Sequence, residues 1–455
     1  MKNTYRIILT LFLFAGLSTP KLPAQQSQAK IFTLEEAVRI AMQKNPDLIS
    51  ARLEVDRADA RVSEAIGTAL PSITLAGQYS HAFKKPVFFL PNFFADRPNE
   101  IVAIEMGTKH SINSSLTVSQ ILFNAAVITG VGVAKIYSGA ARELLRAKEV
   151  ETVAKTRKAF YGALMTKEVV QMMRQTLKNA EDNLRNVQVM GKQGIVSEYD
   201  QLRAEVGIAN LRPMILQAEN NYALALDGLR NTIGLGVNDQ VDIAGMLKFE
   251  PVDPLLLEGA TEKVLEANYG LRAMRMNLEI SDAVVSINKS EYYPTLAAFG
   301  NYQYQLAKNS FNISPNDFIA SSSVGLSLSI NLFNGLQTSS RVEQAKLELQ
   351  KAHEQFNGME KNIRTGTHSV LLQLKQAHQR YEAQGMTVEQ AQRGYKIATT
   401  RFTSGVGTQL EVNDAQLALT QAQVNRIQAI FDYLNAAADF DQLLSRLPLY
   451  ATSTN

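Results

Sequence analysis

Two acidic residues, Glu411 and Asp414, have a spacing at which carboxylates act together. They follow a glycine-containing turn at residues 404–407 and lie about one helical turn apart, so a helix places both on one face. At a narrow opening, such a pair attracts cations and repels anions. Glu411 also has capping-box spacing from Thr408, so a structural role is the alternative for it. For Asp414, which lies beyond the cap, the alternative is a solvated surface carboxylate.

Catalytic and metal-binding chemistry has little support in the sequence. The chain contains no cysteine, which excludes disulfides, thiol chemistry and a lipid anchor on an amino-terminal cysteine. No nucleophile beside a base, paired catalytic acid or phosphate-binding loop is visible. The histidines lack metal-ligand spacing; they are His81, His110, His353, His368 and His378. We therefore expect no enzyme activity, no cofactor and no metal.

Residues 1–24 at the amino terminus have the pattern of a secretory signal peptide. Lys2 and Arg6 precede an apolar stretch at residues 7–17, and Ala24 offers a small residue for cleavage. The stretch is shorter than the about 20 residues that span a bilayer. Cleavage removes three of the 46 basic residues and none of the 43 acidic ones, which leaves a neutral chain. A neutral chain predicts no nucleic-acid partner.

Much of the chain has the hydrophobic spacing of coiled coils. Over residues 370–402, apolar side chains alternate in steps of about three and four, with Gln384 filling one gap. The same spacing returns over residues 417–438, so the two segments are expected to pack as an antiparallel hairpin. A helix over residues 336–402 would be about 100 Å long. In the corresponding helix of the first half, over residues 198–233, Pro213 is expected to cause an interruption and a kink.

The order of elements occurs twice along the chain. Asn268 follows Asn45 by 223 residues. Gly405 follows Gly194 by 211. We therefore expect a tandem duplication. The signal peptide is followed by a first repeat at 25–233, with a β-hairpin at about 71–123 and a helical hairpin at 125–233. A linker at 234–253, long enough to include a short strand, leads to a second repeat at 254–446, which begins with a helix capped by Asp253. This repeat has a β-hairpin at about 294–333 and a helical hairpin at 335–446, and a tail follows at 447–455.

Four segments of roughly ten residues change to strand spacing, a length that crosses a bilayer at a tilt. In the fourth, apolar residues at 324, 326, 328, 330 and 332 alternate with small and polar ones. A soluble sandwich would bury this apolar face, whereas a membrane barrel would turn it towards lipid. We favour the barrel, because the sequence offers no other strands for a second sheet.

Four strands cannot close a barrel, since single-chain barrels have at least about eight. The open edges must therefore pair with other copies of the chain. Two copies would give about eight strands with a filled interior, and three about twelve with room for a passage. The helices carry Lys, Arg, Glu and Gln on their outer faces, so they are expected to project into water on the periplasmic side.

Several short motifs occur in order along the chain, and Leu-Phe-Asn occurs once in each half. They are Thr33-Leu34-Glu35-Glu36-Ala37, Asn45-Pro46, Leu70-Pro71-Ser72, Leu122-Phe123-Asn124, Leu332-Phe333-Asn334 and Gly405-x-x-Thr408-x-x-Glu411-x-x-Asp414-Ala415. With these motifs the sequence resembles the outer membrane efflux proteins of the TolC type over essentially the whole mature chain, from Thr33 to Arg446. Each motif is weak by itself, but together and in order they are specific.

The resemblance implies a mainly α protein with membrane β structure. Three copies would form a trimeric β-barrel of twelve strands in the outer membrane and a periplasmic tunnel of α-helices. The tunnel tip would meet a periplasmic adaptor protein and an inner-membrane pump, and the barrel would contact outer-membrane lipid. The chain would then be a passive exit channel for efflux or type I secretion. The alternative is a periplasmic coiled-coil adaptor without a pore, which would not need the strands.

The resemblance also assigns roles to residues at the hairpin tips. The family closes its periplasmic end with acidic residues after the second hairpin turn, which places the pore constriction at Glu411 and Asp414. It places contacts between neighbouring tips at Asp200 and Tyr199.

Glycines and aromatic residues supply the remaining candidates. Gly194 and Gly405 are expected in the hairpin turns, because glycine ends a helix in the left-handed conformation without strain. An aromatic run lies between the first two strands, in a segment read as a loop, and comprises Phe83, Phe88, Phe89, Phe93 and Phe94. It would plug the outer mouth, contact a partner at the outer leaflet, or cluster to stiffen its loop.

Overall fold

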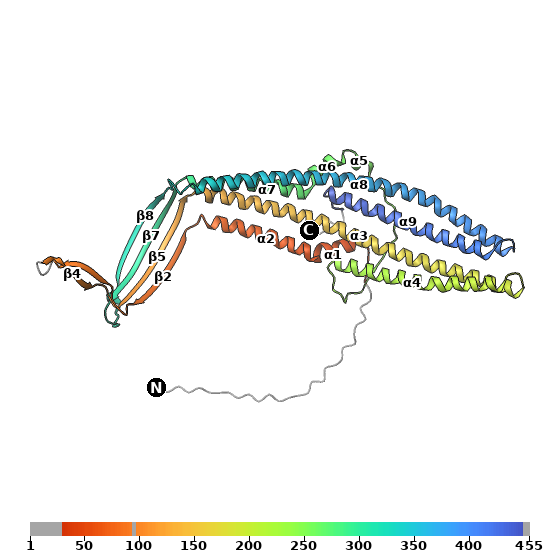
Figure 1. Ribbon diagram of the computed structural model, residues 1–455, viewed down its shortest axis with the longest axis horizontal. Helices are drawn as coiled ribbons and strands as arrows, with labels where there is room; N and C mark the ends of the chain where they lie inside the picture. Colours follow the sequence, from red (N-terminus) through yellow and green to blue (C-terminus); the bar gives the residue numbers. More distant parts are fainter. Residues whose placement is uncertain (1–29, 93–96, 449–455) are drawn as a thin grey trace, which may run out of the picture.

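The chain forms an elongated body with different secondary structure at its two ends. The computed structural model describes residues 30–92 and 97–448. A four-stranded sheet lies at one end, and the turns of two long helical hairpins lie together at the other (Figure 1). The functional question therefore concerns two ends that are separated by the full length of the helices.

The first half contains the long helical hairpin that the spacing predicts. Its elements are α1 (Leu34–Lys44), α2 (Pro46–Gly67), β2 (Ser72–His81), β5 (His110–Phe123), α3 (Ala125–Lys192) and α4 (Glu198–Thr232). The 68 residues of α3 make it about 100 Å long. The interruption expected at Pro213 is wrong, because α4 continues through this residue. α4 packs on α3, and it has buried residues on both sides of the proline, among them Ile208 and Ile215.

The second half repeats this order of long elements. They are α7 (Tyr269–Lys289), β7 (Thr295–Lys308), β8 (Ile319–Ser329), α8 (Gln337–Thr403) and α9 (Gln409–Leu443). The single helix expected after Asp253 is wrong. Asp253 caps the short α5 (Pro254–Leu257), and α6 (Ala260–Ala267) begins only after Gly259. With φ at 60°, Gly259 has a left-handed backbone that cannot continue a right-handed helix.

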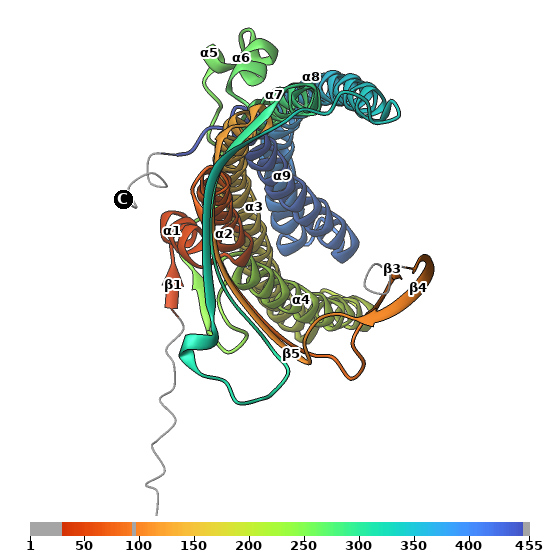
Figure 2. The same ribbon diagram turned by 90° about the vertical axis from the view of Figure 1, so that its left-hand side faces the viewer.

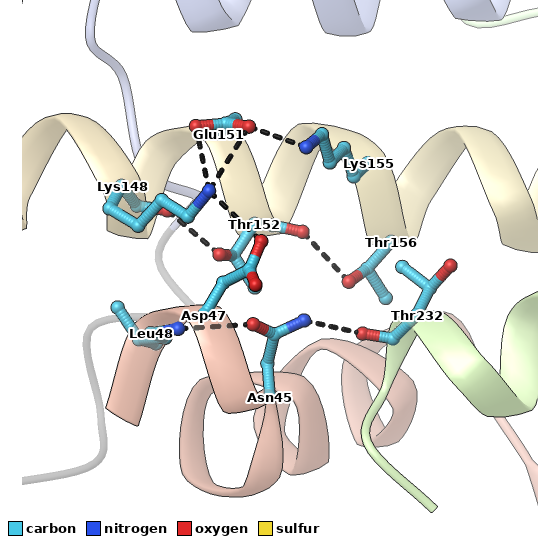
Figure 3. A network of polar contacts seen from close by, with 9 residues as sticks. All are labelled: Asn45, Asp47, Leu48, Lys148, Glu151, Thr152, Lys155, Thr156 and Thr232. Carbon is cyan, nitrogen blue, oxygen red and sulfur yellow. Dashed lines mark hydrogen bonds and ion pairs between the residues drawn. The ribbon is translucent and has the colours of Figure 1, made fainter. Parts of the chain in front are cut away.

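An asparagine at the equivalent position joins the helices in each half. Asn45 Oδ1 accepts from the Leu48 N–H at 3.1 Å and caps α2, and its Nδ2 donates to the Thr232 carbonyl of α4 at 2.8 Å (Figure 3). Asn268 caps α7 in the same way and donates to the Leu443 carbonyl of α9 at 3.3 Å. Thus α2 and α4 meet end to end beside α3, and α7 and α9 meet beside α8.

The linker between the halves returns to the start of the described chain. β6 (Val241–Ile243) pairs in parallel with β1 (Lys30–Phe32). It is the short strand that the sequence analysis allows in the linker. The main hydrophobic core lies next to this pair, where the halves meet; it includes Phe160, Leu164, Leu229, Ile243 and Leu434. These residues come from α3, α4, β6 and α9, so the core holds the two helical hairpins together.

The four-stranded sheet has the order β2-β5-β7-β8, and every neighbouring pair is antiparallel. Its edges, β2 and β8, have no partner among the described strands. One face carries apolar residues in register: Ile73 lies opposite Val118, and Leu75 opposite Leu116. These four side chains are exposed. The soluble sandwich is therefore wrong for the described residues, because no second sheet covers this face.

The segment read as a loop between the first two strands contains a second hairpin. β3 (Val87–Asn92) pairs with β4 (Arg97–Glu105) and extends away from the main sheet (Figure 1). Phe88 and Phe89 lie on opposite faces of β3, so apolar side chains point both ways and hide the alternation of a strand. Phe93 and Phe94 lie outside the described residues.

The fourth strand ends earlier than its alternation suggests. β8 stops at Ser329, whose partner Thr295 is the first residue of β7. Residues 330–332 continue the apolar alternation but have no partner strand in the sheet, because Pro294 and a short 3-10 helix precede β7. The expected strand is therefore wrong at its end.

The helices form a curved wall. Seen from the sheet end, they lie in an arc that is open on one side (Figure 2). None of the described helices is both long enough and apolar enough to cross a membrane.

Candidate functional site at the hairpin tips

The two hairpin turns share one backbone geometry. Gly194 and Gly405 have φ angles of 74° and 75°, as expected for glycine at a helix end. After α3, the Ile195 N–H donates to the Met190 carbonyl at 2.9 Å. After α8, the Val406 N–H donates to the Arg401 carbonyl at 3.0 Å. Both bonds satisfy carbonyls that a helix end leaves free, so each turn is stabilised by its own backbone before the next helix begins.

Asp200 is bonded within its own hairpin. Ser197 Oγ accepts from the Asp200 N–H at 3.2 Å, and the Asp200 carboxylate accepts from the Ser197 hydroxyl at 2.6 Å and from its N–H at 3.3 Å. This reciprocal capping box starts α4. Its carboxylate keeps further lone pairs for a neighbouring tip.

Glu411 fulfils only half of the capping-box interpretation. Thr408 Oγ1 accepts from the Glu411 N–H at 3.2 Å and caps α9. The Glu411 carboxylate instead lies 3.6 Å from Arg401 Nε, on the last turn of α8. Both side chains of this ion pair are about half exposed. Glu411 is therefore a surface carboxylate that Arg401 partly neutralises.

Asp414 is an exposed carboxylate one turn further along α9. Within the described part of the chain, no hydrogen bond or ion pair engages its side chain. Since α9 is helical from Gln409, Asp414 lies on the same face as Glu411, as the spacing predicts. Its negative charge is the less compensated of the two.

Tyr199 presents its ring to solvent at the other tip. The side chain is 65% exposed. The Arg203 guanidinium carbon lies 5.4 Å from the ring centroid, within the range of a cation–π contact. This contact holds an aromatic surface beside Asp200 at the start of α4.

A layer of amides between the two hairpins was missed by the sequence analysis. A small core of Val187, Ala204, Ala398, Phe402 and Val412 closes the tip. Beside it lies a cavity of about 330 Å³. Its lining includes Asn183, Gln409 and Gln416, whose side-chain oxygens are buried without a described hydrogen-bond partner. A buried polar atom without a partner costs about 1–3 kcal/mol. In the sequence, the only indication of this layer is that polar residues occupy positions where the coiled-coil spacing expects apolar ones.

Residues 244–253, here called the strap, cross from one hairpin to the other. The Leu247 N–H donates to Glu168 on α3. Phe249 stacks on Tyr381 of α8, with ring centroids 4.1 Å apart, and packs against Tyr433 of α9 at 4.5 Å. Burial raises the pKa of Glu168 above its ordinary value, although the bond from Leu247 works in the opposite direction.

A partly buried ion pair connects α3 directly to α9. Arg157 Nη1 lies 2.6 Å from Asp441 Oδ2, and the Arg157 side chain is only 14% exposed. Burial alone would lower the pKa of Arg157, but Tyr161 and Asp441 outweigh it, so the pKa lies above its ordinary value. The guanidinium therefore stays charged and ties the two hairpins together next to the strap.

The fold and the tips together define a class of protein: long helical hairpins that carry a small exposed sheet at the end opposite their turns. A family model described as "Outer membrane efflux protein" matches residues 37–235 and 260–446. The chain therefore belongs to the outer membrane efflux protein family.

Individual proteins agree with the family match. The chain is 21% identical to the alkaline protease secretion protein AprF of Pseudomonas aeruginosa, over 71% of this chain and 68% of AprF. It is 22% identical to the outer membrane protein TolC of Vibrio cholerae, over 97% and 95% of the two chains. The crystal structure of the Campylobacter jejuni CmeC outer membrane channel superposes with a TM-score of 0.75 at 16% identity, covering 90% of this chain and 85% of that chain.

The family places the chain in the outer membrane as an exit channel for efflux or secretion. The expected resemblance is confirmed, and the alternative of a poreless adaptor is not favoured. The family is one of transport proteins, in keeping with the expectation that the chain is not an enzyme.

Proposed function

We propose that three copies of the chain form the outer-membrane duct of a tripartite system. Their sheets close a barrel of twelve strands, four from each chain, and their helices enclose a periplasmic tunnel. A periplasmic adaptor protein and an inner-membrane pump meet the tunnel at the hairpin tips. The duct itself is passive, and the pump selects and energises what passes.

The observation that carries this proposal is the exposed sheet. Its apolar face is uncovered among the described residues, and both its edges lack partners there. Lipid satisfies the apolar face, and the edges of neighbouring copies satisfy the backbone groups. The curved wall of helices supports the same assembly, because an arc repeated by rotation closes into a tube (Figure 2).

The acidic pair of α9 is proposed as the constriction of the closed duct. Glu411 and Asp414 lie at the tip of the second hairpin, at the end of the body far from the sheet. Repeated around a rotation axis, they give a ring of carboxylates. Tyr199 and Asp200 are proposed to contact the neighbouring tip, since both follow the first hairpin turn and the Tyr199 side chain is exposed there. Opening then separates the tips.

Single-channel currents in planar bilayers test this function. The wild-type protein should conduct small, cation-preferring currents, because a carboxylate ring attracts cations. A Glu411→Ala/Asp414→Ala variant should conduct larger and less selective currents. The matched control is Glu343→Ala/Glu348→Ala, which removes two exposed acids from the sheet end of α8.

The outcomes separate the duct from its gate. Unchanged currents in the tip variant would keep the duct and remove Glu411 and Asp414 from the constriction. An equal increase in the control would attribute the effect to net charge. Folded wild-type protein that conducts no current would contradict the duct.

A further inference from the structure

Two histidines that are far apart in the sequence meet at the outer end of the sheet. His81 is the last residue of β2 and His110 the first of β5, and the two lie directly opposite each other in the ladder. Their Nδ1 atoms are 3.3 Å apart. The Tyr79 hydroxyl lies 2.9 Å from the same His110 Nδ1. Three side chains with nitrogen or oxygen donor atoms therefore converge at one end of the β2–β5 pair.

The distance between the two nitrogens matches that of two ligands on one metal ion. A tetrahedral zinc ion with nitrogens at 2.0–2.1 Å holds them about 3.3–3.4 Å apart. The ring centroids of His81 and His110 are 4.6 Å apart, so the two Nδ1 atoms are the closer points of the two rings. Without a metal, one of the two Nδ1 atoms must carry a proton and donate it to the other. A bound metal ion would take the place of that proton.

An aromatic ring contacts each histidine. Phe83 meets the His81 ring edge-on at 5.0 Å, and Phe311 meets the His110 ring at 5.3 Å. The apolar groups around a metal site control the access of solvent and the local dielectric. His110 is half-buried and His81 is exposed in the single chain.

Two lysines adjoin His110. Lys308 of β7 lies opposite His110 in the ladder, but its ammonium group donates to Asp317 Oδ2 at 2.8 Å and is partly neutralised. Lys109 is exposed and precedes His110 in the chain. Its backbone carbonyl accepts from the Ala82 N–H at 2.8 Å, which continues the pairing beyond the histidines.

We propose that His81 and His110 bind one divalent d-block cation, with the Tyr79 hydroxyl or water in the remaining positions. Imidazole suits Zn²⁺, Cu²⁺ and Ni²⁺, whereas Mg²⁺ and Ca²⁺ prefer oxygen ligands. The described residues contain no cluster of three or more His, Cys, Asp or Glu fit for a metal, so this site has two protein nitrogens and open positions.

The ion would clamp β2 to β5 at the base of the β3–β4 hairpin. The chain leaves the main sheet directly after His81 and returns directly before His110. A bond bridging these residues shortens the free connection to the aromatic hairpin and restrains its motion. The site lies within one chain, so it does not depend on the proposed trimer or on the pore.

Isothermal titration calorimetry with ZnCl₂ on the full, untagged chain in detergent tests the site. At pH 7.5 we expect saturable binding of one Zn²⁺ per chain. His81→Ala and His110→Ala should each weaken binding by at least about tenfold. His353→Ala, at an exposed position on α8, should bind as the wild type does. Excess Mg²⁺ should leave the isotherm unchanged, and Cu²⁺ should displace Zn²⁺.

Two outcomes would contradict the proposal. Wild-type protein without saturable Zn²⁺ uptake would overturn the site. So would equal uptake by the wild type and the His81→Ala variant. If an alanine variant fails to fold, His81→Gln and His110→Gln, which keep the bulk and polarity, are judged by the same criteria.

Discussion

At the scale of single residues, the two turn glycines are conformational requirements. A Cβ at Gly405 would meet no atom within 4 Å, so a substitution there meets only backbone strain at a φ of 75°. Gly405→Ala should therefore destabilise the chain by about 1–2 kcal/mol. Gly394 is the matched control: it lies within helical α8, also with nothing within 4 Å. Gly394→Ala should stabilise by about 0.5–1 kcal/mol. Urea denaturation followed by circular dichroism measures both, and equal signs would contradict this account.

The two carboxylates of the proposed constriction should not contribute equally. Glu411 lies 3.6 Å from Arg401 Nε, whereas Asp414 has no described partner. Asp414→Asn should therefore reduce the cation preference of single-channel currents more than Glu411→Gln. Reversal potentials in a salt gradient measure this. Arg401→Gln should in turn increase the cation preference, because it frees the charge of Glu411. A larger effect of Glu411→Gln than of Asp414→Asn would show that the ion pair is broken in the assembled duct.

Local sequence patterns predicted some of these residues and not others. Gly194 and Gly405 depend on neighbours within a few residues, so spacing was sufficient. The Glu411–Arg401 pair spans the turn and depends on how the two helices emerge from it. The His81–His110 pair depends on the strand register across an entire hairpin, which spacing along the chain does not reveal.

At the scale of elements, the ion pair between α3 and α9 should be worth more than surface pairs. Arg157→Ala leaves Asp441 partly buried without its partner and should cost about 2 kcal/mol. Arg393→Ala is the control, since the Arg393–Glu389 pair is about 70% exposed. It should cost less than about 0.5 kcal/mol. Urea midpoints compare the two, and similar losses would show that the Arg157 pair is not special.

The strap should make stability depend on pH through Glu168. Its pKa is raised in the folded state, so the folded chain binds more protons than the unfolded chain between the two pKa values. Its contribution is full below the unfolded pKa of about 4.3 and is lost as pH rises through the folded pKa. Glu168→Gln keeps an acceptor for the Leu247 N–H but cannot ionise. The variant should gain stability over the wild type from pH 4 to pH 7, and a constant difference in urea midpoints would exclude a raised pKa.

The long helices could be predicted because their spacing persists over many turns, whereas other elements depended on partners. β8 ends at Ser329 because β7 begins opposite it, although apolar alternation continues to Leu332. The sequence of the β3–β4 hairpin lacks the alternation of a strand, because both strands are apolar on both faces and β3 includes Pro91. A strand of this kind has no period that a sequence pattern can detect.

At the scale of the whole molecule, the sheet explains why copies can assemble. Its strands alternate in direction along the order β2-β5-β7-β8, so β8 runs opposite to β2. The β8 edge of one copy can therefore pair in antiparallel fashion with the β2 edge of the next, and the same pairing repeats around a rotation axis. This contact is head-to-tail, so it closes into a ring.

Cysteine cross-linking counts the members, because the chain has no cysteine of its own. Thr74 of β2 and Ser327 of β8 lie on the polar face of opposite edges. Neighbouring antiparallel strands have Cα atoms about 4.5–5.5 Å apart, within reach of a disulfide. Because the register between copies is open, Thr74→Cys is combined in turn with Ser323→Cys and Ser327→Cys. In at least one combination, oxidation should produce covalent dimers and trimers and nothing larger.

The control moves the first cysteine to the middle of the sheet. Thr117 of β5 lies directly opposite Thr74, but β5 is paired on both sides within its own chain. Thr117→Cys/Ser327→Cys should therefore form no covalent oligomer, since no edge of another copy reaches β5. Dimers without trimers in every edge combination would favour a two-copy barrel of eight strands, whose interior side chains fill, and would remove the passage through the sheet. If trimers are the largest cross-linked species, three edge-to-edge contacts close the ring, and the resulting barrel is wide enough to conduct.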